Sequence, residues 1–222
     1  MKAIIKSVGI VELTQRHFLS RGGEGAVYVK GDTAYKIYDT NVPPISYAKM
    51  QELSVLNRSN IIKPERVITD NMGMPIGYTM RFVKNTHPLV QLFTKAFKQR
   101  NGLSPEKILV LVKELQETVS FIHAKGILIV DLNEMNFLVE GGWGDVYAID
   151  VNSYQTPSFP ATVLMPSVKD HHAKKFSEVT DWYSWGIVAF QMLVGIHPYK
   201  GNHPDFDSTP MDSRMEARMK AN

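Results

Sequence analysis

Short apolar runs separated by turn residues occupy the first third of the chain, a pattern typical of β-strands. Phe18 and Leu19 lead into a glycine cluster, and residues 26–30 and 34–38 follow with a turn between them at Gly31 and Asp32. This order predicts an antiparallel meander, in which each strand pairs with the next one along the chain.

A helical segment over residues 45–57 follows Pro43 and Pro44. Two further strand candidates come next, over 65–69 and 77–83, joined by the turn sequence DNMGMP. One helix among five short strands predicts a small α+β lobe.

From Thr86 onward the apolar positions recur with a helical period. Ser104 has the residue type of an N-cap, Pro105 suits the first helical position, and Gly126 suits the end of a helix. The apolar stripe between them consists of Ile108, Leu111, Val112, Leu115, Val119 and Ile122. We therefore expect one long amphipathic helix here.

The rest of this half mixes short strands with a second apolar helix. Strands are expected over 137–139 and 146–149, followed by a proline-rich irregular segment and a buried, tryptophan-rich helix over 180–194. The change of period near residues 83–86 predicts an N-lobe over 1–84 and a mainly helical C-lobe over 85–222.

The tail places Met211, Met215 and Met219 four residues apart behind Pro210, with Glu216 and Lys220 spaced for an i,i+4 ion pair. This pattern predicts a short amphipathic helix. Its methionine stripe is covered either by its own lobe, which we favour, or by a partner or a missing C-terminal region of a longer parent chain.

Composition narrows the class of protein without naming a partner. In the 222 residues, 44% hydrophobic and 21% charged content argues against disorder, and a net charge of +3 is too mild to indicate nucleic acid or a membrane. There is no cysteine, hence no disulfide framework and no thiolate metal site.

Lys6 interrupts the only apolar run near the start, so we expect no signal peptide and a cytoplasmic protein. The adjacent His171 and His172 are poorly placed to chelate one ion and are expected at the surface.

Glycines and a lysine make the first candidate site. In SRGGEGAVYV, Gly22 and Gly25 lie in a turn between strands, where missing Cβ atoms let backbone amides approach phosphate oxygens, although a plain hairpin has the same pattern. In AYKIY, strand alternation puts Ala34 and Lys36 on one face, suited to a flat base and its phosphates. A solvated edge-strand lysine is the alternative. Glu52, on the following helix, could pair with Lys36.

Carboxylate and amide side chains make the second candidate site. In DLNEMN, Asp131 follows the apolar residues 127–130, and a buried aspartate costs free energy unless it is hydrogen-bonded, ion-paired or metal-bound. Asn136 and Asp150 offer an amide oxygen and a carboxylate, which suit Mg²⁺. Each pair alone could also be a capped turn.

Taken in this order, the segments resemble the protein kinase fold over residues 18–201. The resemblance implies ATP and Mg²⁺, with Lys36 and its partner Glu52 at the phosphates, Asp131 as catalytic base, and Asn136 and Asp150 on the metal. DWYSWG, residues 181–186, resembles the helix that anchors the catalytic loop and is the most discriminating match. The resemblance also implies a nucleotide pocket lined by Gly22, Gly25, Val27, Ala34, Met80, Arg81, Val83 and Leu138, with Met80 as gatekeeper and the backbone of Arg81 and Val83 as hinge.

The chain departs from the kinase pattern in several places. Ser20 replaces the first loop glycine, and Ile129 and Val130 replace the histidine and arginine before the catalytic aspartate. Without that arginine, we expect activity that does not depend on phosphorylation of the activation segment. Asn133 replaces a lysine, which leaves the acceptor type open.

The turn after the metal aspartate and the end of the activation segment depart as well. Asn152 replaces a glycine and is expected to keep the turn by adopting positive φ. Met165, Pro166 and Ser167 stand where the family has a glutamate, which suggests a trimmed helical lobe or a fragment.

Three functions are compatible with these residues. The leading one is Mg-ATP-dependent phosphoryl transfer to a protein hydroxyl, with serine or threonine favoured over tyrosine. A small-molecule kinase of the aminoglycoside phosphotransferase type is the second, and DWYSWG speaks against it. The third is a nucleotide-binding pseudokinase scaffold, which the intact Lys36 and Asp150 speak against.

Overall fold

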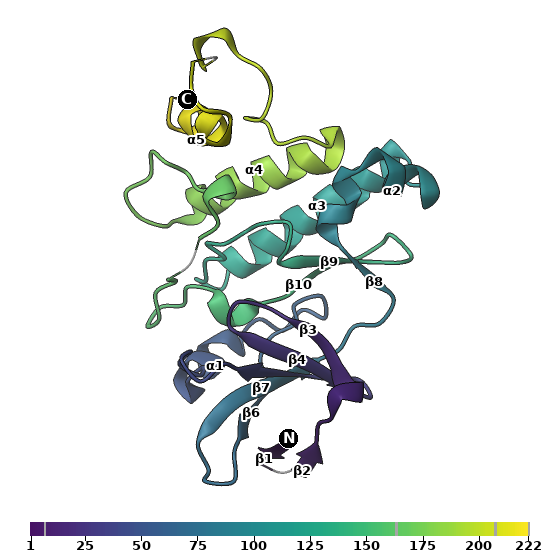
Figure 1. The fold of residues 1–222 in the computed structure, drawn as a ribbon, viewed down its shortest axis with the longest axis vertical. Helices are drawn as coiled ribbons and strands as arrows, with labels where there is room; N and C mark the ends of the chain where they lie inside the picture. The colour runs from purple at the N-terminus through teal and green to yellow at the C-terminus, as the bar shows by residue number, and fades with distance from the viewer. Residues whose placement is uncertain (7, 163, 207, 222) are drawn as a thin grey trace. The chain divides into compact units, whose positions relative to one another are not determined.

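A computed structural model describes residues 1–6, 8–162, 164–206 and 208–221, apart from the side chain of residue 212. The chain forms two compact units. The first consists of Met1–Lys84 together with Asp150–Asn152, and the second of Asn85–Ile149 together with Ser153–Asn222. Their elements are labelled in Figure 1.

In its described residues, the first unit is built on a seven-stranded antiparallel sheet with one α-helix, α1 (Tyr47–Leu53). The strands are β1 (Lys2–Ile5), β2 (Gly9–Glu12), β3 (Phe18–Arg21), β4 (Gly25–Lys30), β5 (Thr33–Tyr38), β6 (Arg66–Thr69) and β7 (Pro75–Arg81). Their order in the sheet is β2-β1-β6-β7-β5-β4-β3. The meander β3-β4-β5 is confirmed, as is the α+β class.

The sequence prediction missed two strands and overextended one helix. β1 and β2 have only four residues each, too few for alternation to stand out. Helix α1 begins after Ser46, whose hydroxyl accepts a hydrogen bond from the Lys49 N–H, and it ends at Leu53, where the Ser54 hydroxyl donates to the Gln51 carbonyl. These caps leave residues 54–57 outside the helix.

Lys36 lies in the interior of this sheet. Its strand β5 pairs with β4 through Val27 and with β7 through Tyr78, and Lys36 is 8% exposed. At Gly77 on β7, a Cβ atom would overlap the Lys36 carbonyl oxygen, so glycine permits the close approach of the two strands. The alternative of a solvated edge-strand lysine is therefore wrong.

The second unit is mainly helical, with a small three-stranded sheet of order β10-β9-β8. Its helices are α2 (Lys95–Arg100), α3 (Pro105–His123), α4 (Glu178–Val194) and α5 (Met211–Ala221), and its strands are β8 (Thr86–Pro88), β9 (Phe137–Glu140) and β10 (Val146–Ala148). Helices α3 and α4 pack against each other (Figure 1). Short 3₁₀ helices include η2 (Leu89–Phe93), η4 (Pro166–Val168) and η5 (Pro204–Phe206).

Helix α3 forms as its sequence predicts. The Ser104 hydroxyl accepts a hydrogen bond from the Lys107 N–H, Pro105 opens the helix, and Gly126 adopts a φ of 71° just beyond its end. All six residues of the predicted stripe are buried. Helix α4 is buried on one face only, because Val179, Phe190, Leu193 and Val194 on it are exposed.

The predicted tail helix is α5, and it carries the expected Glu216–Lys220 ion pair at 2.7 Å. Its methionines differ in burial: Met219 is 1% exposed, whereas Met211 is 81% exposed. Arg218 donates to the Tyr199 carbonyl at 3.0 Å and helps to hold the helix on its own unit. Among the described residues, no helix is both long and apolar enough to cross a lipid bilayer.

His197 is a buried link between two loops of this unit. Its Nε2–H donates to the Ser167 carbonyl at 2.8 Å, and its Nδ1 accepts from the Tyr199 N–H at 3.2 Å. These contacts fit the neutral ring. Burial lowers the pKa of His197 below its usual 6.5, although the bond to Ser167 opposes this.

We expect His197 to make folding stability sensitive to acid. Below about pH 6.5 the unfolded chain binds more protons at this position than the folded chain, so its stabilising contribution falls as pH falls. Thermal unfolding should show that the difference in stability between wild type and His197→Gln becomes smaller from about pH 7 to pH 5. The exposed His172→Gln variant serves as control, and a gap that stays constant would contradict the expectation.

Candidate functional site

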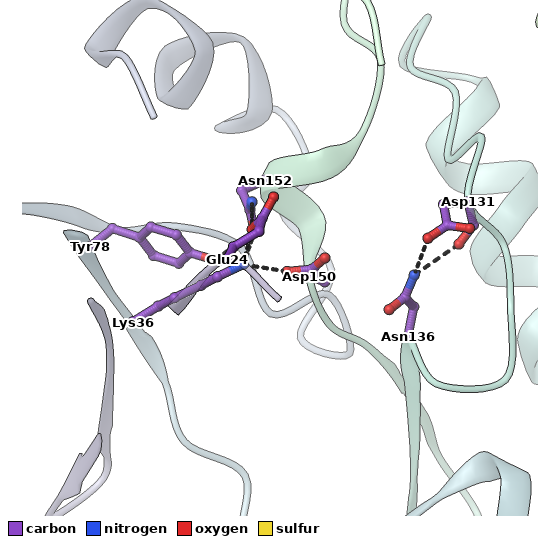
Figure 2. Close-up of polar contacts among 7 residues, drawn as sticks. All are labelled: Glu24, Lys36, Tyr78, Asp131, Asn136, Asp150 and Asn152. Atoms are coloured by element: carbon purple, nitrogen blue, oxygen red, sulfur yellow. Dashed lines mark hydrogen bonds and ion pairs between the residues drawn. The ribbon is translucent and has the colours of Figure 1, made fainter. Parts of the chain in front are cut away.

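Three side-chain oxygens surround the ammonium of Lys36 (Figure 2). Lys36 Nζ donates to Glu24 Oε2 at 2.5 Å, to Asp150 Oδ1 at 2.7 Å and to Asn152 Oδ1 at 3.3 Å. All of these residues belong to the first compact unit. Because an ammonium has three N–H donors, each donor has an acceptor.

The cluster keeps its charges. Burial alone would lower the pKa of Lys36, but the carboxylates of Asp150 and Glu24 outweigh it and raise that pKa. Burial would likewise raise the pKa of Glu24, yet its hydrogen bond with Lys36 produces a net lowering. The lysine is therefore a cation and Glu24 an anion at neutral pH.

Asn152 and Tyr78 brace this arrangement from the buried side. The Tyr78 hydroxyl donates to Asn152 Oδ1 at 2.6 Å, and Asn152 Nδ2 donates to Glu24 Oε2 at 3.3 Å. Tyr78 is 1% exposed, and burial raises its pKa well above the usual value, which keeps it a neutral donor. Lys36 Nζ also lies 5.9 Å from the Tyr78 ring centroid, within cation–π range.

The expected turn at Asn152 is placed differently. The residue with positive φ is Asp150, at 57°, whereas Asn152 lies in the 3₁₀ helix η3 (Val151–Ser153) with its side chain in the Lys36 cluster. The amide is used for hydrogen bonds to Lys36 and Glu24, so it is a site residue rather than a glycine substitute.

The structure does not bring Glu52 to Lys36. Glu52 is half-buried on α1, whereas the carboxylates at Lys36 Nζ are those of Glu24 and Asp150. Sequence reasoning named Glu52 because of its place on the helix, and it passed over Glu24. The one signal for Glu24 was a carboxylate in a turn made otherwise of glycines.

Register confirms the predicted face of the sheet. Ala34 and Lys36 share a face by alternation, and cross-strand pairing places Val27 beside Lys36 and Met80 beside Ala34. Arg81 is exposed at the end of β7, Val83 follows it, and Leu138 is half-buried on β9 in the second unit. Val27, Ala34 and Met80 thus lie on the same face of the sheet as the lysine.

The two loop glycines differ in what they require. Gly25 has a φ of 155°, and a Cβ there would overlap the Ile37 carbonyl oxygen, so β4 and β5 need glycine at this position. A Cβ at Gly22 would meet no atom within 4 Å. The Gly22 N–H donates to the Gly25 carbonyl at 2.9 Å and closes the turn.

Asp131 and Asn136 lie together in the second unit. Asn136 Nδ2 donates to Asp131 Oδ2 at 3.2 Å and to the Asp131 carbonyl at 2.9 Å (Figure 2). Asp131 Oδ1 accepts from the Met165 N–H at 2.7 Å, and Asn133, 1% exposed, accepts from the Met135 N–H. The loop is thus fixed by its own amide groups, with Asp131 half-exposed.

Asp181, the first residue of DWYSWG, clamps the segment that precedes Asp131. It is fully buried, and its Oδ2 accepts from the Ile129 N–H at 2.8 Å and from His123 Nε2 at 2.9 Å. Its Oδ1 accepts from the Val130 N–H at 2.8 Å. Val130 has a φ of 64°, a left-handed conformation that costs about 1–3 kcal/mol for a β-branched residue and needs such a clamp.

Replacing Asp181 by Asn should destabilise the protein by about 3 kcal/mol. The NH₂ group of the amide would face N–H donors that now bond to a carboxylate oxygen, so buried N–H groups would lose their acceptors. Urea unfolding would measure the loss. The exposed Asp145→Asn substitution removes the same charge and should change the free energy of unfolding by less than about 0.5 kcal/mol. Equal effects of the two substitutions would contradict the clamp.

Comparison with known proteins finds no family model that matches, but several curated serine/threonine kinases are similar to this chain. Serine/threonine-protein kinase KIN4 of Saccharomyces cerevisiae is 24% identical over 79% of this chain and 22% of its own length. Serine/threonine-protein kinase AtPK1/AtPK6 of Arabidopsis thaliana is 24% identical over 88% and 44%. Ribosomal protein S6 kinase alpha-2 of Homo sapiens is 24% identical over 82% and 27%.

The chain spans less than half the length of each of these three relatives. The similarity nonetheless runs over most of the chain in all three, and the fold combines an antiparallel sheet with one helix and a mainly helical unit. These similarities support a protein kinase-like superfamily as the class to which the chain is related.

Proposed function

We propose that this chain binds Mg-ATP and transfers the terminal phosphate to a protein hydroxyl, with serine or threonine favoured over tyrosine. The observation that carries the proposal is the partly buried Lys36–Asp150 ion pair at 2.7 Å, whose lysine shares a face of the sheet with the apolar side chains of Val27, Ala34 and Met80. A charged lysine next to a flat apolar surface suits a nucleotide, whose base is planar and whose phosphates are anionic.

Lys36 would neutralise phosphate charge. Its raised pKa keeps the ammonium protonated, and its position in an interior strand fixes the direction of its N–H donors. Ala34, on the same face as Lys36, would meet the base with a short side chain. The backbone of Arg81 and Val83, at the end of β7, would offer hydrogen bonds to the edge of that base.

Asp150 and Asn136 have the donor types that Mg²⁺ prefers, a carboxylate and an amide oxygen. Asn136 uses its nitrogen toward Asp131, so its oxygen is the atom suited to the metal. When bound, Mg²⁺ would offset phosphate charge. Asp150 and Asn136 would hold the metal.

Asp131 would orient the acceptor hydroxyl and take its proton. Its carboxylate is aimed by the Asn136 amide on one oxygen and by the Met165 N–H on the other. Asn133 is buried and bonded to the backbone of its own loop, so it supports Asp131 rather than facing an acceptor. The preference for serine or threonine rests on the names of the similar kinases.

We also propose that activity does not require phosphorylation of the activation segment. Val130, 3% exposed, stands where a phosphate-binding arginine would be, and it packs inside the unit instead. The Met165 N–H already ties the segment to Asp131.

Two other functions remain as alternatives. A nucleotide-binding scaffold is favoured by the three acceptors that already occupy the N–H donors of Lys36. The Asp181 clamp argues against a small-molecule kinase, because Asp181 is part of DWYSWG, the motif that resembles protein kinases.

Incubation of phosphatase-treated protein with γ-labelled Mg-ATP tests the proposal, alone, with a generic protein substrate and with a panel of aminoglycosides. We expect label on protein serine or threonine, and a rate that falls about 10²–10⁴-fold in Asp131→Asn because the general base is lost. The exposed Asp145→Asn protein should keep wild-type turnover. Label on an aminoglycoside would favour the small-molecule reaction, and no turnover with a melting temperature raised by Mg-ATP would favour the scaffold.

A further inference from the structure

The donors of Lys36 are all in use. Its three N–H groups point to Glu24, Asp150 and Asn152, and the shortest of the three contacts is the one to Glu24, at 2.5 Å. A phosphate oxygen that contacts this ammonium must therefore replace one of the three acceptors.

Asp150 and Asn152 are held in place. Asn152 is 7% exposed and accepts the Tyr78 hydroxyl at 2.6 Å, which fixes its amide. Asp150 lies two residues away, just before η3, with its backbone in the left-handed region. Moving the Asn152 amide would break its buried hydrogen bond with Tyr78.

Glu24 has more freedom to leave. Its side chain is 39% exposed, and it follows Gly22 and Gly23, where an added Cβ would meet no atom within 4 Å. Its own carbonyl accepts the Asp39 N–H at 2.9 Å, which ties the backbone of the turn to the end of β5. The carboxylate can therefore swing out by side-chain rotation while the strands stay paired.

We infer that the Glu24 carboxylate occupies the place on Lys36 that a nucleotide phosphate takes, and so acts as a built-in competitor that lowers affinity for phosphorylated ligands. This inference rests on the proposed nucleotide site. Glu24 weakens triphosphate binding in two ways. It occupies an N–H donor of Lys36, and its negative charge repels the phosphates. A neutral nucleoside meets neither obstacle.

Titration calorimetry of wild type and Glu24→Gln with Mg-ATP and with adenosine tests this inference. Glutamine keeps the size of the side chain and removes its charge. Mg-ATP should bind Glu24→Gln about fivefold to tenfold more tightly, the range expected for loss of a partly exposed charge-assisted hydrogen bond, while adenosine affinity stays the same.

Glu12→Gln is the matched control. It removes one exposed charge from β2, which is separated from β5 by β1, β6 and β7 in the sheet, and should change neither affinity. Glu24→Ala is a second variant that should act in the same direction as Glu24→Gln, and the melting temperature of each variant shows that it is folded.

Each other outcome identifies which idea fails. Wild type that binds Mg-ATP while Glu24→Gln binds it equally or less tightly overturns the inference and leaves the proposed function standing. Equal tightening for adenosine overturns it too, since a neutral ligand is not subject to charge competition. Failure of wild type and both Glu24 variants to bind Mg-ATP removes the proposed function and the inference with it.

Discussion

A buried ammonium must be compensated by oxygen atoms, and at Lys36 this requirement organises the first compact unit. An unpaired charge there would cost several kcal/mol. The sheet meets the requirement by bringing Glu24 from the turn before β4 and the segment Asp150–Asn152 from more than a hundred residues along the chain. Asp150 and Lys36 lie together because each neutralises the charge of the other.

The second unit contains a buried charge of the opposite sign, which also needs hydrogen-bond partners. Asp181 is a buried carboxylate, and it is satisfied by two backbone N–H groups and by His123 rather than by a cation on a long side chain. These hydrogen bonds hold Val130 in a strained conformation and so fix the position of Asp131, the next residue. Ile129 and Val130 are both buried, so apolar residues can fill the positions that carry histidine and arginine in the family pattern.

Elements with strong local signals could be predicted from the sequence, and contacts between distant side chains could not. Helix α3 has an N-cap, a proline at its first position and an unbroken stripe, each decided within a few residues. The shared face of Val27, Ala34, Lys36 and Met80 follows from alternation and register. Glu24 and Asn152 were missed because the choice between Glu24 and Glu52 as a partner depends on distances across the fold. Strands β1 and β2 were missed because four residues give each face only two positions.

The central claim is that Lys36 binds a nucleotide phosphate at the place where Glu24 now lies. The most direct measurement is a structure determined with Mg²⁺ and a non-hydrolysable ATP analogue bound. The account predicts a phosphate oxygen about 2.7–2.9 Å from Lys36 Nζ, the Glu24 carboxylate turned away, and the Tyr78–Asn152 bond intact. An analogue bound with its phosphates elsewhere, while Lys36 keeps all three present acceptors, would contradict it.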